Sequence, residues 1–131
     1  MNQMTALDQY KAVGVQSGMT DATPHQMITM LLDGALDRIA SAKGAIARNE
    51  VARKGELLGS AIAIIDGMRA SLDYNGGGEI AANLGSLYDY IERRLLEANT
   101  SADVAILDEV GGLLKEIKSG WNSIPADVRK V

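Results

Sequence analysis

Apolar residues recur at alternating steps of three and four positions in four successive stretches of the chain, and this spacing restricts the fold more than any other feature. In the last stretch the series has no gap: Leu107, Val110, Leu114, Ile117, Trp121 and Ile124. Steps of three and four place the side chains on one face of an α-helix, which needs neighbouring helices to bury it. Four such faces in one chain predict that helices pack on helices, without a sheet.

Capping residues, glycines and prolines indicate where the four helices begin and end. Thr23, Pro24 and Gln26 form a capping box with proline at the first helical position, and Pro125 ends the last helix. Short links favour antiparallel neighbours, so we predict an all-α, antiparallel up-down-up-down four-helix bundle. The predicted helices are 24–48, 51–73, 79–99 and 102–123. They form a bundle at 23–125 that follows an N-terminal arm at 1–22 and precedes a short tail at 126–131.

Glycines mark one turn and one unusual helix interior. We interpret the Asn-Gly-Gly-Gly run at 75–78 as the turn before the third helix, since a phosphate-binding loop would need a preceding strand and a following Lys-Ser or Lys-Thr. Gly111 and Gly112 lie inside the fourth helix, where each costs about 1 kcal/mol relative to alanine. They indicate close contact with a neighbour or local softness. Thr100 and Asp103 predict a capping pair for that helix.

The composition excludes several classes of protein. With 47% apolar and 23% charged residues the chain is globular rather than disordered, and without cysteine it has no disulfide framework. A net charge of −4 argues against a nucleic-acid-binding surface. No apolar run reaches the ~18 residues that span a membrane, and the N-terminus lacks the pattern of a signal peptide. We therefore expect a cytoplasmic protein that neither binds nucleic acid nor inserts into a membrane.

The sequence also lacks the residues that catalysis or metal binding would need. Di-iron helix bundles use paired Glu-x-x-His motifs, whereas this chain has a single histidine, His25, and no such motif. A lone histidine has no partners for a metal or catalytic site, so we expect His25 to cap a helix or to lie exposed at its start. We predict no catalytic residue, no metal site and no cofactor, and hence a binding protein rather than an enzyme.

Several segments taken together resemble the flagellin export chaperones of the FliS family. Residues 23–36, which run from Thr-Pro-His-Gln to Asp-Gly-Ala-Leu, resemble the first helix of that family. Shorter matches follow in the same order along the chain, at 71–73, 77–81, 83–84, 87–90, 94–95 and 98–99. The similarity covers about residues 10–124, and one departure is Leu32, where the family commonly has tyrosine.

The resemblance implies a cytoplasmic chaperone that holds the C-terminal segment of flagellin, prevents its polymerisation and delivers it to the type III export gate. An amphipathic segment of this kind binds by placing apolar anchors in grooves between helices. Leu57 and Ile64 form a second apolar stripe on the second helix, a face wider than one pair of partners needs, although ordinary core is the simpler explanation. The predicted partner-binding residues, some of which must be core, are Tyr10, Leu57, Ile64, Met68, Leu84, Leu87 and Ile91.

The N-terminal arm carries Leu7, Tyr10 and Val13 but no strong helical pattern. Tyr10 matches a tyrosine that is common in the N-terminal segment of the family, and a tyrosine ring suits a reversible anchor. We expect an arm that is mobile or that docks on the client groove of the free protein and leaves when flagellin binds. A helical adaptor or secretion chaperone for a different client remains the alternative, and monomer and homodimer both stay open.

Overall fold

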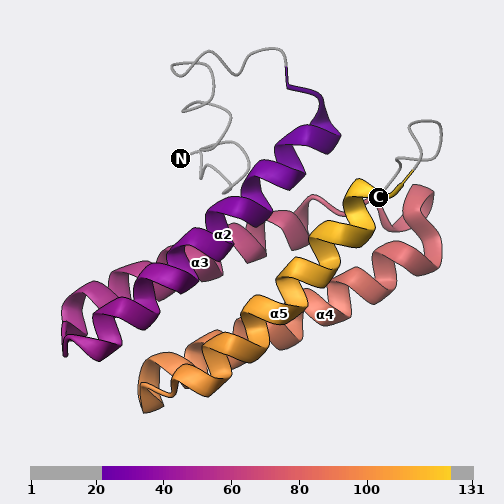
Figure 1. Ribbon diagram of the computed structural model, residues 1–131. Coiled ribbons are helices and arrows are strands. Elements are labelled where there is room, and N and C mark those ends of the chain that lie inside the picture. The colour runs from indigo at the N-terminus through magenta and orange to yellow at the C-terminus, as the bar shows by residue number, and fades with distance from the viewer. Residues whose placement is uncertain (1–21, 125–131) are drawn as a thin grey trace, which may run out of the picture.

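Residues 22–124 of the computed structural model form four α-helices, with no strand among them (Figure 1). The helices are α2 (Pro24–Ala47), α3 (Val51–Ala70), α4 (Tyr74–Ser101) and α5 (Val104–Asn122). The predicted all-α class and the four predicted helices are therefore confirmed for this part of the chain. Tyr10, almost all of the predicted arm and the predicted tail lie outside the described residues.

Each helix packs on two neighbours, so the four helices surround one core. α2 contacts α3 and α5, and α4 contacts the same two helices. Lys54, near the start of α3, donates a hydrogen bond to the backbone oxygen of Asn99, near the end of α4, at 2.7 Å, so these two helices are antiparallel. In Figure 1 the chain reverses at each link, which gives the predicted up-down-up-down bundle.

The core is mainly aliphatic, with Tyr88 and Trp121 as the aromatic side chains buried in it within residues 22–124. The largest fully buried side chains come from all four helices: Leu31, Leu32, Leu58, Ile65, Met68, Ile91, Leu95, Leu107, Val110 and Leu114. Burial of one such side chain stabilises a fold by about 1.5–3 kcal/mol, because apolar surface leaves water. The last three belong to the predicted apolar series of α5, whose helical spacing is thereby confirmed.

Helix α2 begins with the predicted capping box. The Gln26 N–H donates to Thr23 Oγ1 at 3.1 Å, the Thr23 N–H donates to Gln26 Oε1 at 2.8 Å, and Pro24 is the first helical residue. Two N–H groups at the helix start are thus satisfied by side chains. The cap therefore sets where α2 starts.

The link between α3 and α4 differs from the prediction, because Asp73 belongs to the start of α4 rather than to the end of α3. Asp73 Oδ1 accepts a hydrogen bond from the Gly76 N–H at 2.8 Å, and α3 has already ended at Ala70. Residues 75–78 lie inside α4, so the prediction that they form the turn is wrong. Helical geometry is interrupted at Gly78, whose φ of 54° and ψ of −129° suit a residue without a Cβ.

The start of α4 is less buried than the sequence predicts. Ile80 continues the helical spacing of Leu84, Leu87 and Ile91, which predicts burial, yet it is 58% exposed. Gly85 and Tyr88 are buried instead. The phenol of Tyr74 lies against Gly85, where a Cβ would collide with its oxygen. The absence of a side chain at Gly85 therefore lets the residue at the start of α4 pack on the helix beyond the kink.

The cap of α5 also differs from the prediction. Asp103 is the N-cap residue, and its carboxylate accepts a hydrogen bond from the Ala105 N–H at 2.9 Å. Thr100 still belongs to α4, where its hydroxyl donates to the backbone oxygen of Leu96 at 3.2 Å, so the predicted pairing of Thr100 with Asp103 is wrong. Ala102, with a φ of 54°, makes the left-handed turn between the two helices.

His25 and Trp121 join the start of α2 to the end of α5. Their rings stack with centroids 4.5 Å apart and an interplanar angle of 7°. His25 Nε2 lies 2.8 Å from the Trp121 carbonyl oxygen and carries the proton, since a carbonyl can only accept, while Trp121 Nε1 donates to the His25 carbonyl at 2.9 Å. The expectation that His25 lies exposed is wrong, because its ring is partly buried in this contact, and the carbonyl that it caps belongs to the last turn of α5 rather than to its own helix.

Candidate functional site

The residues predicted to bind a partner fall into two groups according to burial. Three belong to the core, with exposed fractions of 6%, 2% and 0%: Ile64, Met68 and Ile91. Leu57, Leu84 and Leu87 are partly buried and pack against that core. The first group offers no surface to a partner unless helices move apart, whereas each leucine of the second group offers part of its side chain.

The leucines of the second group do not meet on one surface. Leu57 lies in the first half of α3, and Leu84 and Leu87 lie in the first half of α4. Because α3 and α4 are antiparallel, with Lys54 bonded to Asn99, Leu57 is level with the end of α4. At 1.5 Å per residue, about 15 Å of helix separates that level from the other two leucines. Leu84 and Leu87, about one turn apart, share a face.

We call the contact between α3 and α4 the α3–α4 seam. Charged side chains of the two helices pair across it. Arg69 of α3 forms ion pairs with Asp66, Asp89 and Glu92 at N–O distances of 2.7, 3.3 and 3.3 Å. Asp89 also pairs with Arg93 on the surface of α4. The guanidinium of Arg69 therefore bridges the two helices near the end of α3, close to the link that joins it to α4.

Glu92 is the least exposed member of this network. Its side chain is 14% exposed, and its buried Oε2 lies at ion-pair distance from Arg69 but makes no hydrogen bond within residues 22–124. Burial raises the pKa of Glu92, Arg69 opposes that rise, and the carboxylates of Asp66 and Asp89 add to it. The seam thus holds its buried carboxylate through one guanidinium.

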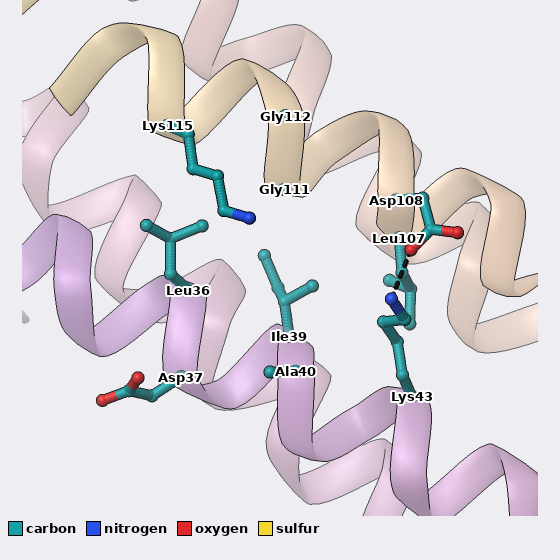
Figure 2. A pocket seen from close by; sticks show the side chains of 10 residues that line it. All are labelled: Leu36, Asp37, Ile39, Ala40, Lys43, Leu107, Asp108, Gly111, Gly112 and Lys115. Atoms are coloured by element: carbon teal, nitrogen blue, oxygen red, sulfur yellow. Dashed lines mark ion pairs between the residues drawn. The ribbon is translucent and has the colours of Figure 1, made fainter. Parts of the chain in front are cut away.

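The contact between α2 and α5, the α2–α5 seam, contains an open groove of about 360 Å³ (Figure 2). Leu36, Ile39 and Ala40 of α2 line one side, and Gly111 and Gly112 of α5 line the other. In Figure 2 the side chains of Leu36 and Ile39 point toward the gap, while the two glycines present only backbone. One wall of the groove is therefore apolar and the other is bare helix.

The groove is open because the two residues that line it at the middle of α5, Gly111 and Gly112, have no side chain. A Cβ placed on Gly111 or Gly112 would have no atom within 4 Å. Of the two predicted explanations, close contact between helices is therefore wrong, and local softness stays a prediction. Glycine lowers helix stability by about 1 kcal/mol relative to alanine, and no steric need within residues 22–124 offsets that loss here. The glycine pair is the signal of the groove that the sequence contains.

Two ion pairs between α2 and α5 bound the groove. Lys43 of α2 pairs with Asp108 of α5, and Asp33 of α2 pairs with Lys118 of α5. Asp33 and Lys43 are ten positions apart, as are Asp108 and Lys118, so the two pairs lie about 15 Å apart along antiparallel helices. The part of the seam between the two ion pairs is therefore as long as about ten residues of α-helix.

Two charged residues of the lining, Asp37 and Lys115, have no ion-pair or hydrogen-bond partner within residues 22–124. In Figure 2 the Lys115 side chain extends into the gap, whereas Asp37 points away from it. An apolar wall, exposed backbone and one cation together suit an amphipathic segment. In the same range no helix has the length and apolar character of a membrane span, and no three acidic, histidine or cysteine side chains converge as metal ligands would.

The chain is similar to one group of proteins over nearly its whole length. The family described as Flagellar protein FliS matches residues 6–128. Flagellar secretion chaperone FliSB of Pseudomonas aeruginosa is 49% identical over 124 residues, which are 95% of this chain and 98% of the relative. Flagellar secretion chaperone FliS of Salmonella typhimurium is 45% identical over 125 residues, 95% of this chain and 93% of the relative. The protein of the same name from Bacillus subtilis is 35% identical over 115 residues, 88% of this chain and 85% of the relative.

Proposed function

This chain belongs to the FliS family of flagellar proteins, and on that premise we propose that it is a cytoplasmic chaperone for the C-terminal segment of flagellin. It keeps the bound segment from polymerising and delivers it to a component of the flagellar type III export gate. Relatives at 49% and 45% identity are named flagellar secretion chaperones, which supports this class of function. Such a protein acts by binding and catalyses no reaction.

The observation that carries the proposal is the open groove of the α2–α5 seam. A bundle whose seams are all filled has no place for a further helix, whereas here space remains between Ile39 and Gly111. A client segment that is disordered when free loses conformational entropy on binding, so it needs apolar surface to bury. The wall formed by Leu36 and Ile39 supplies such surface, and the bare backbone opposite allows close approach.

A client that wraps around the bundle has further contacts available. Leu84 and Leu87 share a partly exposed face of α4 and form our proposed second contact. Leu57 is a separate proposed contact on α3, and Tyr10 stays a predicted contact of the arm. The three buried residues of the predicted set take part only if the client separates the helices that cover them.

Calorimetric titration of the full-length chain with a peptide of the flagellin C-terminal segment tests the proposal. We expect one peptide per chain and a negative heat-capacity change, because apolar surface is buried. Gly111→Leu fills the groove from its bare wall, and loss of one client side chain from the site should weaken binding at least about tenfold. Gly59→Leu is the matched control, because Gly59 is an exposed helical glycine of α3 with equally open space beside it. It should leave binding unchanged.

The outcomes separate the alternatives. Absence of binding by the full-length chain overturns the proposed client. Equal capture of flagellin with and without its C-terminal segment would favour a chaperone that recognises something else. If Gly111→Leu and Gly59→Leu are both folded and bind equally well, the client does not occupy the groove. Sedimentation of the free chain distinguishes a monomer from a homodimer.

A further inference from the structure

We propose that Lys115 determines which segments enter the groove of the α2–α5 seam, by pairing with a carboxylate on the bound helix. This inference rests on the proposed function, because it assigns a recognition role within the same groove. The segment that Lys115 selects is an amphipathic helix of about ten residues, the length between the two bounding ion pairs. It carries an apolar residue and an aspartate or glutamate one helical turn apart.

The position of Lys115 suits this role. Its side chain extends from α5 into the gap beside Leu36 and Ile39 (Figure 2). Lys115 is four positions from Gly111 and three from Gly112, so the three residues share one face of α5. A helix laid along this face meets bare backbone first and the ammonium group one turn further on. An apolar side chain fits the first position and a carboxylate fits the second.

Lys115 is also the lysine of this seam whose ammonium group forms no ion pair within residues 22–124. The other two lysines of the seam, Lys43 and Lys118, already pair with aspartates of the facing helix. Lys115 has no such partner within residues 22–124, and Asp37, the remaining carboxylate of the lining, points away from the gap. The bounding pairs are neutral overall, so Lys115 gives the groove its positive charge.

The expected effect follows from the strength of partly exposed ion pairs. Lys115→Glu replaces attraction by repulsion, so it should weaken binding of the flagellin C-terminal peptide about five- to twentyfold at low ionic strength. The effect should shrink in about 1 M salt, where the screening length falls to about 3 Å. Arg53→Glu is the matched control, since it reverses an exposed charge on α3 outside the groove. It should change the affinity by less than about twofold.

Peptide variants identify the carboxylate that Lys115 recognises. Each aspartate or glutamate of the flagellin peptide is changed in turn to its amide and titrated into the full-length chain. One of these changes should weaken binding to the wild type and have no effect on binding to Lys115→Gln. Lysine at the same peptide position should restore binding to Lys115→Glu, because the two charges are then exchanged.

Failure of this inference differs from failure of the proposed function. If the wild type binds no peptide, both are overturned. If the wild type binds but Lys115→Glu binds equally well, or if Arg53→Glu weakens binding to the same extent, the chaperone function stands and Lys115 is not its determinant. If sedimentation shows that the wild type self-associates and Lys115→Glu separates the copies, the groove holds a second copy of the chain and the inference is overturned.

Discussion

An arginine bridges the α3–α4 seam near its link, whereas two glycines lie at the middle of the α2–α5 seam. Arg69 pairs with a carboxylate of its own helix and with two of α4, so charged groups bridge that contact. Gly111 and Gly112 leave their contact unfilled. The α2–α5 seam is held instead at its borders, by two ion pairs and by the stacked rings of His25 and Trp121.

The two seams show that a groove can arise from the local sequence of one helix without a change of architecture. Both seams join neighbouring antiparallel helices over the same aliphatic core. The arginine at one seam supplies a side chain that reaches the facing helix, while the glycines at the other supply none. The contacts that hold α2 to α5 and the open groove between these helices therefore lie at different positions along the seam. The proposed client would enter the groove without displacing those contacts.

The largest expected loss of unfolding free energy comes from removing the contact between Trp121 and His25 at the end of the α2–α5 seam. Trp121 is 8% exposed and both stacks on His25 and donates to its backbone oxygen. Trp121→Ala should lower the free energy of unfolding by about 3–5 kcal/mol, measured by urea denaturation. Trp121→Phe keeps a ring and loses the donor, so its loss should be smaller, about 1–3 kcal/mol. An equal loss in both variants would show that the ring stacking stabilises nothing.

A smaller change in the free energy of unfolding is expected when the arginine that bridges the α3–α4 seam is removed. Arg69→Met removes the cation beside the buried Glu92 Oε2, and an unpaired buried acceptor costs about 1–3 kcal/mol of unfolding free energy. Arg93→Met is the control, because Arg93 is exposed and pairs with Asp89 at the surface. Its loss should stay within about 0.5 kcal/mol. Equal losses in the same denaturation series would show that Arg69 adds no stability to the α3–α4 seam.

The smallest expected effect is the dependence of the unfolding free energy on pH that Glu92 causes. Burial raises the pKa of Glu92 above its ordinary value of 4.5, so the folded state holds this proton more tightly than the unfolded state. The stability from Glu92 is therefore complete below about pH 4.5 and is lost as the pH rises through the raised pKa. We expect Glu92→Gln to gain stability relative to the wild type between about pH 4 and pH 7. Denaturation at several pH values measures that difference.

Glu109 provides a control of opposite sign. Tyr90 Oη and Arg94 Nε donate hydrogen bonds to its carboxylate at 2.7 and 2.8 Å, and these bonds lower the pKa of Glu109. Its contribution is present above its ordinary pKa of 4.5 and is lost as the pH falls through the lowered value. Glu109→Gln should therefore lose stability relative to the wild type as the pH rises. If Glu92→Gln and Glu109→Gln both gained, or both lost, stability relative to the wild type as the pH rises, the opposite pKa shifts of the two carboxylates would be contradicted.

The fold could be predicted because helical periodicity and capping are local. The capping box at Thr23 and the apolar series of α5 are where the spacing places them. The errors lie where one side chain could serve either of two helices. Asp73 could end α3 or cap α4, and the hydrogen bond to the Gly76 N–H decides for α4. His25 could not be placed, because its partner Trp121 is 96 positions away.

The candidate site was harder to predict, because a groove depends on what two distant helices present to each other. The sequence shows that Gly111 and Gly112 lack side chains, but not whether a neighbouring helix fills the space. It also does not show the register that aligns Lys43 with Asp108. Periodicity alone could not separate the buried Ile64 from the half-buried Leu57, because both lie beside the inner stripe of α3.

The stacked pair of His25 and Trp121 joins residues that leave the ribosome at very different times, since a chain is synthesised from its N-terminus at a limited rate. α2 can pair with α3 across a short link soon after both emerge. The second wall of the groove forms only when α5 has been made and can reach α2. The proposed client groove is therefore completed near the end of synthesis, and an unfinished copy lacks its second wall.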